Sequence, residues 1–400
     1  MMYDYVIIGG GIVGLAVGMA ILNWKPNAAI AVLEKEKSVA AHQTGHNSGV
    51  IHSGIYYRPG SYKAKLAKKG NEAMYRFCHE HGIDAEMCGK VIVANKEEEL
   101  VLLENLYKRG IENGLSIRMI EERELHELEP YVNGIKAIHV PATGIVNFKK
   151  VAEKMAEIIQ EKGGQILLDH KVESITEKND EAVIDTNQHT IKTSFYINCA
   201  GLYSDRIAKL ANIQTDLRIV PFRGEYYQLK PEKRYLVKNL IYPVPNPNFP
   251  FLGVHFTRMI DGTVDVGPNA VLSFKREGYL KTDFSFMDTK DVLFFKGFWK
   301  LASRYAKEGI EEMARSFSKR QFVKNVQQLM PDIEEDDLLP GPSGVRAQAL
   351  KEDGTLVDDF YIVHGRRSIH VLNAPSPAAT ASIEIGKEIV RQLEEFRLAI

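Results

Sequence analysis

Three glycines near the start of the chain have the spacing of a phosphate-binding turn. Gly9, Gly11 and Gly14 fit the pattern GxGxxG, and Glu34 follows 25 positions after Gly9. In this pattern the first glycine permits a tight turn, the second lets the backbone approach a pyrophosphate, and the third lets a helix lie close to a strand. A carboxylate at Glu34 suits both hydroxyls of a ribose and disfavours a 2′-phosphate. The predicted chemistry is dinucleotide binding at the positive end of a helix, with a purely structural glycine turn as the alternative.

A second turn of small residues favours FAD over NAD as the dinucleotide. Ala200 and Gly201 follow an apolar segment that ends at Cys199, and NAD enzymes of this fold do not require such a turn. Near the end of the chain, Ser376 and Pro377 have the residue types of an N-cap and a first helical position. The positive end of that last helix would stabilise the anionic edge of a reduced flavin. Ordinary helix capping is the alternative.

The elements that must position these residues form a βαβ unit. Residues 5–8 are a β-branched run, residues 12–22 have small and apolar side chains at helical spacing, and residues 29–34 show a second buried-strand pattern. Such a unit predicts a parallel sheet that is covered on both faces. Residues 368–373 predict a last strand, followed by a helix to about Phe396, so both ends of the chain are expected in one sheet.

The remaining segments predict a second, interleaved domain. The length of 400 residues exceeds one ordinary core, which stops growing near about 250–300 residues. Residues 217–339 are dense in aromatic residues and proline, with strand patterns at 225–229, 252–257 and 263–266, and are expected to hold the substrate. We therefore predict an α/β protein whose Rossmann-like FAD-binding domain is interleaved with an α+β substrate domain built on an antiparallel sheet. The FAD-binding domain is assigned residues 1–80, 144–212 and 338–400, and the substrate domain residues 81–143 and 213–337.

Composition excludes several other classes of protein. The chain has 51 basic and 52 acidic residues, so no overall field attracts nucleic acid. Its three cysteines have no CxxC pair and no zinc spacing, which predicts no metal site and a reducing compartment. The N-terminus lacks the features of a signal peptide, and no apolar run reaches the roughly 18–20 residues of a membrane span. A cytoplasmic protein is expected, in peripheral contact with the cell membrane at most.

Six segments distributed along the chain carry a resemblance to a known family. They resemble the D-amino-acid-oxidase-like superfamily of FAD-dependent oxidoreductases, whose FAD domain is of the glutathione-reductase-like type, and within it the L-2-hydroxyglutarate oxidase/dehydrogenase family. The glycine pattern identifies only the superfamily, whereas the segments around His52, His255 and Asn373 are specific to the family. The six segments are residues 44–57, 221–227, 250–257, 267–270, 344–348 and 373–380.

The resemblance implies a cofactor and a reaction. It implies FAD, and hydride transfer from the substrate Cα to flavin N5, which converts L-2-hydroxyglutarate into 2-oxoglutarate with oxygen or a quinone as electron acceptor. Non-covalent attachment of the flavin is expected because no cysteine lies near its C-terminal segment, and a covalent bond through His52 is the alternative. The residues expected to hold FAD are Gly9, Gly11, Gly14, Glu34, Thr44, Ser48, Gly49, Val172, Ala200, Gly201, Asn373, Pro375, Ser376 and Ala378.

The implied reaction requires a base and two anion sites. An alcohol keeps its proton near neutral pH, so its oxidation needs a proton acceptor, and His52 and His255 are the two candidates. The carboxylates of the substrate suit bidentate guanidinium groups, for which Arg346 is the first choice and Arg223 the second. The alternatives are histidines bonded only to backbone and arginines held in structural ion pairs.

Other functions on the same scaffold stay open at this point. They are a glycerol-3-phosphate-type dehydrogenase, an amine or amino-acid oxidase, and a non-catalytic FAD-binding scaffold protein. The segment from Val292 to Val323 combines Phe294, Phe295, Phe298 and Trp299 with six cations. This combination would suit docking at an anionic membrane surface and electron delivery to a quinone, and a helix packed on its own domain is the alternative. The six cations are Lys296, Lys300, Arg304, Arg315, Lys319 and Arg320.

Overall fold

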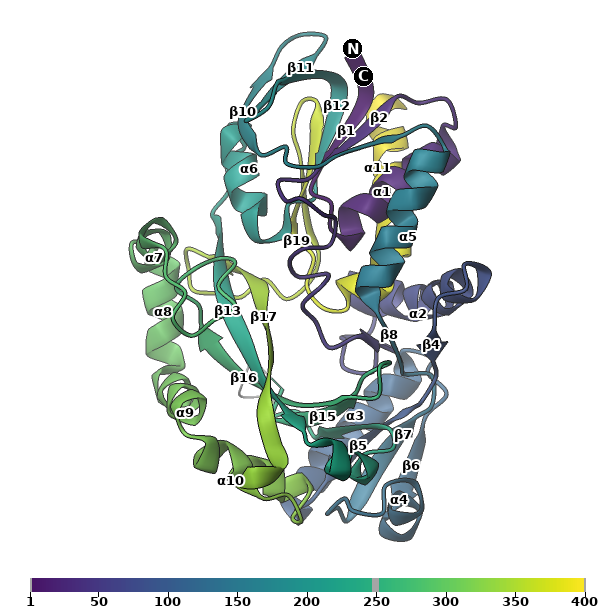
Figure 1. Ribbon diagram of the computed structural model, residues 1–400, viewed down its shortest axis with the longest axis vertical. Helices are drawn as coiled ribbons and strands as arrows, with labels where there is room; N and C mark the ends of the chain where they lie inside the picture. The colour runs from purple at the N-terminus through teal and green to yellow at the C-terminus, as the bar shows by residue number, and fades with distance from the viewer. Residues whose placement is uncertain (1, 247–251, 399–400) are drawn as a thin grey trace.

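Two sheets with their helices form two bodies, one above the other in Figure 1. The computed structural model describes residues 2–246 and 252–398. β1, at the start of the chain, and β19, near its end, belong to the same upper sheet, as expected from the sequence. The chain passes between the bodies repeatedly, so each sheet is assembled from segments that are far apart in the sequence.

The upper sheet is parallel at its centre, and its central strands are buried on both faces. In β1 (Met2–Ile8), Tyr5 and Ile7 belong to one apolar core, whereas Val6 and Ile8 belong to the core on the opposite face. β1 lies between β2 and β12, and β12 also pairs in parallel with β19. The other strands are β2 (Ile30–Leu33), β9 (Gln165–Leu167), β10 (Val172–Glu177), β11 (Ala182–Thr186), β12 (Thr190–Asn198), β18 (Tyr361–His364) and β19 (Ser368–Asn373).

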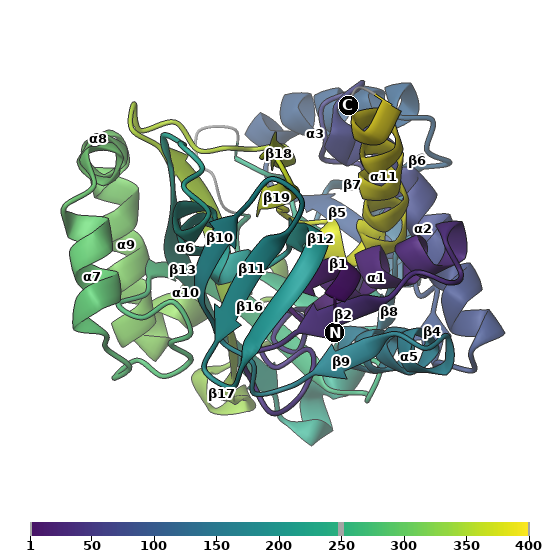
Figure 2. The ribbon, with the colours of Figure 1, turned by 90° about the horizontal axis from the view of Figure 1, so that it is seen from above.

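Helices cover the upper sheet closely. α1 packs against both α5 and α11 in one apolar core, and α11 packs against α2 as well. A Cβ added to Gly386 of α11 would lie 2.5 Å from the carbonyl oxygen of Ala16 in α1, so only glycine permits this approach. Figure 2 shows α1, α2 and α11 on the side of the molecule opposite α7 and α9. The helices are α1 (Ile12–Trp24), α2 (Tyr62–Glu80), α5 (Phe148–Glu161), α6 (Ser204–Leu210) and α11 (Ala378–Leu398).

The lower sheet is antiparallel, except that β14 and β5 run parallel. Its order is β17-β13-β16-β15-β14-β5-β7-β6. The strands are β5 (Lys90–Ala94), β6 (Arg118–Glu121), β7 (Lys136–Val140), β13 (Leu217–Leu229), β14 (Leu240–Pro243), β15 (His255–Arg258), β16 (Val264–Leu272) and β17 (Leu338–Lys351). The helices of this body are α3 (Leu100–Glu112), α4 (Glu122–Leu128), α7 (Phe286–Leu293), α8 (Lys296–Arg304), α9 (Ala306–Phe317) and α10 (Lys319–Leu329). A small sheet of β3 (Val50–Ile51), β8 (Gly144–Val146) and β4 (Ala85–Glu86) lies beside them.

The predicted fold class is confirmed, and several boundaries differ. β17 pairs with β13 along most of its length, so residues 338–351, which were predicted from the sequence to belong to the FAD-binding domain, lie in the lower sheet. The strand predicted at 252–257 begins at His255. Residues 250–251, in the segment 250–257 that carries the family resemblance, lie outside the described residues. The last helix begins at Ala378, so Ser376 and Pro377 form the turn before it and are not its cap and first residue.

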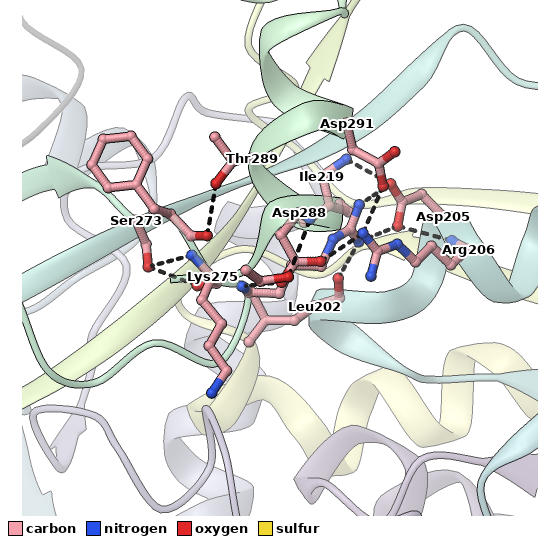
Figure 3. A network of polar contacts seen from close by, with 12 residues as sticks. Leu202, Asp205, Arg206, Ile219, Ser273, Lys275, Asp288, Thr289 and Asp291 are labelled. Carbon is pink, nitrogen blue, oxygen red and sulfur yellow. Dashed lines mark hydrogen bonds and ion pairs between the residues drawn. The ribbon is translucent and has the colours of Figure 1, made fainter. Parts of the chain in front are cut away.

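A buried ion network joins the two bodies (Figure 3). Arg276, in the lower body, is 1% exposed and donates to both carboxylate oxygens of Asp205 in α6, at 2.5 and 2.8 Å. Asp288 of α7 accepts one bond from Arg206 of α6 at 2.6 Å and another from the backbone N–H of Arg276 at 2.9 Å. Because each buried charge has a partner of opposite sign, α6 and α7 are held in one fixed arrangement.

Candidate active site

One cavity of about 1040 Å³ extends between the two bodies and brings most of the predicted residues together. Its size is at the upper end of the range for ligand sites, which suits an extended dinucleotide together with a small substrate. Gly14 and Gly49 are not part of its wall. The predicted residues that line it are Gly9, Gly11, Glu34, Thr44, Ser48, His52, Val172, Ala200, Gly201, Arg346, Asn373, Pro375, Ser376 and Ala378.

The three glycines of the N-terminal turn have different roles. Gly9 has a φ of +114°, and a Cβ there would lie 2.5 Å from the carbonyl oxygen of Cys199. A Cβ on Gly14 would lie 2.0 Å from the carbonyl oxygen of Gly9. The fold itself therefore requires these two glycines. Gly11 faces the cavity, and a Cβ there would meet only the Thr44 hydroxyl at 3.4 Å, so the space at Gly11 serves a ligand.

The carboxylate of Glu34, just after the end of β2 and predicted to contact a ribose, is fixed by two backbone N–H groups. Its Oε2 accepts a bond from the backbone N–H of Gly10 at 2.8 Å, and its Oε1 accepts one from Glu36 at 3.0 Å. The hydroxyl of Thr44 accepts from the backbone N–H of Ile12 at 3.0 Å, which ties the following loop to the start of α1. Both side chains are almost completely buried yet line the cavity, so this part of the site fits an adenosine diphosphate group.

The start of α11 also forms part of the wall. Ala378, Ala379 and Thr380 line the cavity, and the first turn of the helix carries no acidic residue. Its positive end therefore faces the cavity, as a reduced flavin requires. The side chain of Asn373 donates to the carbonyl oxygens of Val357 and Asp359, both at 2.9 Å. This residue consequently contributes to the site by fixing the neighbouring loop.

A row of polar and aromatic side chains follows one face of the lower sheet. Tyr226 of β13 and Arg346 of β17 line the cavity. On β15, His255 is 4% exposed and stacks on Tyr242 of β14, with ring centroids 4.0 Å apart. Its Nδ1 lies 2.9 Å from the carbonyl oxygen of Gly253, so Nδ1 carries the hydrogen and the neutral ring keeps a free lone pair on Nε2.

Both candidate histidines are held in the neutral form. Burial is the main cause that lowers the pKa of His52 to about 3, with the positive charges of Lys90 and Arg346 adding to the effect. Burial likewise lowers the pKa of His255 to about 3, against the bond to Gly253. At neutral pH both imidazoles are therefore unprotonated, and each has a ring nitrogen with a lone pair that can accept a proton. Of the two, only His52 belongs to the wall of the cavity.

Arg223 lies apart from the other predicted residues. Gly224 and Tyr226 of the same strand line the cavity, whereas Arg223 faces the other side of the sheet. Its Nε and Nη2 donate to Glu225 at 3.1 and 2.8 Å, and its Nη1 donates to the carbonyl oxygen of Leu280 at 2.9 Å. The guanidinium is therefore engaged in an internal ion pair, and the structure does not bring it to Arg346.

Sequence reasoning missed Lys90, which lies close to the histidines. Lys90 is 1% exposed, and burial lowers its pKa to about 7. Its ammonium lies 4.4 Å from the ring centroid of Tyr56 and 5.0 Å from that of Tyr242. The signal that could have revealed it is a single lysine at the head of the apolar strand that continues to Ala94, a position where a charge is rarely buried.

A group of ligand-type side chains in the wall of the cavity already contains a cation. Glu36, His42 and Glu277 are close enough together to bind a metal ion. The ammonium of Lys35 lies 2.8 Å from Glu277 and 3.0 Å from His42, and it also contacts Glu36. The lysine supplies the positive charge that this group requires, so the cluster joins the two bodies as an ion network.

Fold and site together define a two-domain oxidoreductase that binds an extended dinucleotide. The chain belongs to the FAD-dependent oxidoreductase family of the D-amino-acid-oxidase type, which matches residues 4–392. FAD is accordingly the cofactor, and the glycine turn, Glu34 and the start of α11 fit it.

Close relatives cover nearly the whole chain. L-2-hydroxyglutarate dehydrogenase of Indibacter alkaliphilus is 54% identical over 388 residues, which are 96% of this chain and 97% of that protein. The mitochondrial L-2-hydroxyglutarate dehydrogenase of Homo sapiens is 47% identical over 411 residues, 98% of this chain and 89% of that protein. Among solved structures, L-α-glycerophosphate oxidase from Mycoplasma pneumoniae with FAD bound has a TM-score of 0.80 at 24% identity, covering 98% of this chain and 95% of that one.

Proposed function

We propose that this enzyme oxidises L-2-hydroxyglutarate to 2-oxoglutarate. One observation carries the proposal: the guanidinium of Arg346 and the unprotonated imidazole of His52 line the same cavity. The relatives that are 47–54% identical and nearly equal in length are L-2-hydroxyglutarate dehydrogenases. This agreement favours a hydroxy acid over glycerol 3-phosphate or an amino acid as the substrate.

Each side chain has a defined part in the reaction. Arg346 binds the carboxylate next to the reacting carbon, and its planar fork fixes the orientation of Cα. His52 accepts the hydroxyl proton while the bond between Cα and oxygen becomes a carbonyl. FAD, when bound, would supply the acceptor for the hydride of Cα. His255 is the second candidate for the base, because its Nε2 keeps a lone pair.

We also propose that the electrons leave to oxygen or to a quinone, the latter through contact with a membrane surface. Among the described residues no helix is long and apolar enough to span a bilayer. Phe294 and Trp299 are 81% and 58% exposed, whereas Phe295 packs in the core of its own domain. Met287, 62% exposed, also lines the cavity, so the exposed surface of α7–α9 adjoins the site. Further exposed apolar side chains there are Phe284, Phe286, Leu293, Ile310, Met313 and Phe317.

Anaerobic bleaching of the flavin tests the proposed reaction directly. L-2-hydroxyglutarate should reduce the flavin of the purified protein, while D-2-hydroxyglutarate, glycerol 3-phosphate and amino acids should leave it oxidised. Equimolar 2-oxoglutarate should form as the colour is lost. Bleaching by glycerol 3-phosphate or an amino acid in place of the hydroxy acid would reject the proposal, and a flavin that none of these compounds reduces would favour a scaffold protein.

A further inference from the structure

Lys90 is a buried cation without a counter-ion. Within residues 2–246 and 252–398, its ammonium forms no hydrogen bond and no ion pair, and its polar contacts are with the faces of Tyr56 and Tyr242. Burial alone lowers its pKa to about 7. An ammonium removed from water needs an anion or several acceptors to offset the lost hydration, so this position suits a charged ligand.

The hydroxyl of Tyr56 is a second unsatisfied group beside Lys90. Its Oη is buried and has no hydrogen-bond partner among the described residues. The Lys90 ammonium lies 4.4 Å from the ring of the same residue. Buried polar groups are nearly always hydrogen-bonded in native proteins. Two neighbouring groups that can each donate a hydrogen bond, and that lack an acceptor, together fit one carboxylate.

The position of Lys90 in the sheet complements that of Arg346. Lys90 begins β5 and Arg346 lies on β17, while β14, β15, β16 and β13 separate these two strands. His255 lies on one of the intervening strands, and the positive charges of Lys90 and Arg346 both act on His255 and on His52. The two cations thus lie on strands to either side of β15, the strand that carries His255.

We propose that Lys90 and Tyr56 bind the second carboxylate of the substrate, the one remote from the reacting carbon, and so select a dicarboxylic hydroxy acid over a monocarboxylic one. The inference rests on the proposed function for the identity of the acid. It assigns the remote anion site, which sequence reasoning gave to Arg223, to a lysine on β5, an interior strand on the other side of β15 from Arg346.

A comparison of paired ligands tests this site. Binding of 2-oxoglutarate and of 2-oxopentanoate, which has the same chain length without the second carboxylate, is measured by calorimetry on the FAD-loaded protein. Lys90→Met should weaken 2-oxoglutarate binding by roughly 30-fold or more, as for loss of one partner of a buried charged pair. Binding of 2-oxopentanoate should change less than about threefold, since its ligand contacts do not involve Lys90. Tyr56→Phe should give a smaller loss in the same direction.

Control variants separate binding from folding. Lys136→Met makes the same substitution on the neighbouring strand β7, where the lysine pairs with Glu121 at the surface, and should not alter the preference between the two acids. Lys90→Arg keeps the charge and should retain most of the preference. A Lys90→Met protein that keeps the parent preference for the dicarboxylate would overturn the inference, as would an equal loss of both acids. If the parent fails to oxidise L-2-hydroxyglutarate, the proposed function fails, while the binding comparison still decides the role of Lys90.

Discussion

Thr380, in the first turn of α11, is hydrogen-bonded to the backbone of His52. Its hydroxyl accepts from the N–H of His52 at 3.1 Å and donates to the carbonyl oxygen of Val50 at 3.2 Å. One buried side chain thereby fixes the loop that carries the proposed base relative to the positive end of the last helix. The distance between the base and the cofactor depends on this link.

Replacing Thr380 by valine should therefore slow catalysis and destabilise the protein. Valine has nearly the same shape but leaves the N–H of His52 and the carbonyl of Val50 without a partner, which costs about 1–3 kcal/mol for a buried group. Chemical denaturation of the FAD-loaded protein measures the loss of stability, and stopped-flow flavin reduction measures the rate. Thr380→Ser restores the hydroxyl and should behave as the parent. A valine variant with the parent rate and stability would show that the link is dispensable.

Gly11→Val should abolish FAD binding without unfolding the chain. The space at Gly11 is open apart from the Thr44 hydroxyl, so the added methyl groups obstruct the approach of the pyrophosphate and not the fold. Gly14→Ala is the contrasting variant, because its Cβ would collide with the backbone of Gly9. Absorbance of bound flavin and far-UV circular dichroism distinguish the two outcomes. Full retention of FAD by the Gly11 variant would place the cofactor elsewhere.

The proposed base and anchor should have different kinetic signatures. His52→Ala should lower the rate of flavin reduction by about 10²–10⁴-fold, the usual contribution of a positioned base. Arg346→Lys should chiefly weaken substrate binding, because a point charge does not reproduce the bidentate fork. His255→Ala should reduce the rate less than His52→Ala does. A larger loss of rate in the His255 variant would show that His255, and not His52, is the base. Stopped-flow reduction by L-2-hydroxyglutarate over a range of concentrations separates rate from affinity.

kcat/KM should not show the fall at acid pH that protonation of a histidine base usually causes. It should instead fall at alkaline pH. With a pKa of about 3, His52 and His255 stay unprotonated, so kcat/KM should not fall as the pH is lowered from about 7 to about 5. The charged form of Lys90 exists below its pKa of about 7 and is lost as the pH rises through that value. kcat/KM for the dicarboxylate should therefore fall above about pH 7. Lys90→Arg should remove this decline. If the variant keeps the decline, a group other than Lys90 causes it.

The exposed surface of α7–α9 should bind anionic vesicles at low salt. Phe294 and Trp299 supply apolar contact, and Lys290, Lys296 and Lys300 beside them are also exposed. Sedimentation with phosphatidylserine vesicles should decrease strongly in a Phe294→Ser, Trp299→Ser double variant. Tyr235→Ser removes an aromatic side chain that is 60% exposed outside α7–α9 and serves as the control. A parent protein that does not sediment at all would reject the membrane contact.

Local patterns made the FAD end of the site predictable. Gly9, Gly11 and Glu34 lie within one βαβ unit, and their predicted roles follow from their spacing. The substrate end depends on pairing between distant strands. Lys90 is buried because β5 pairs with β14, with Lys90 opposite Leu240, and the sequence near Lys90 contains no sign of that partner. Arg223 faces one side of the sheet because of the strand register, and β13 also has an irregularity between Glu225 and Tyr227. Neither feature can be recognised from the residue types alone.

The interleaving of the two sheets has a consequence for biosynthesis. The glycine turn leaves the ribosome first, yet β1 lies beside β12, which in turn lies beside β19 near the opposite end of the chain. Until residues 368–380 emerge, β12 has an unpaired edge there and the cavity lacks the wall formed by α11. The cofactor can therefore be captured only after synthesis is nearly complete. A chain that stops before β19 should fail to retain FAD, although its entire N-terminal nucleotide-binding motif has been made.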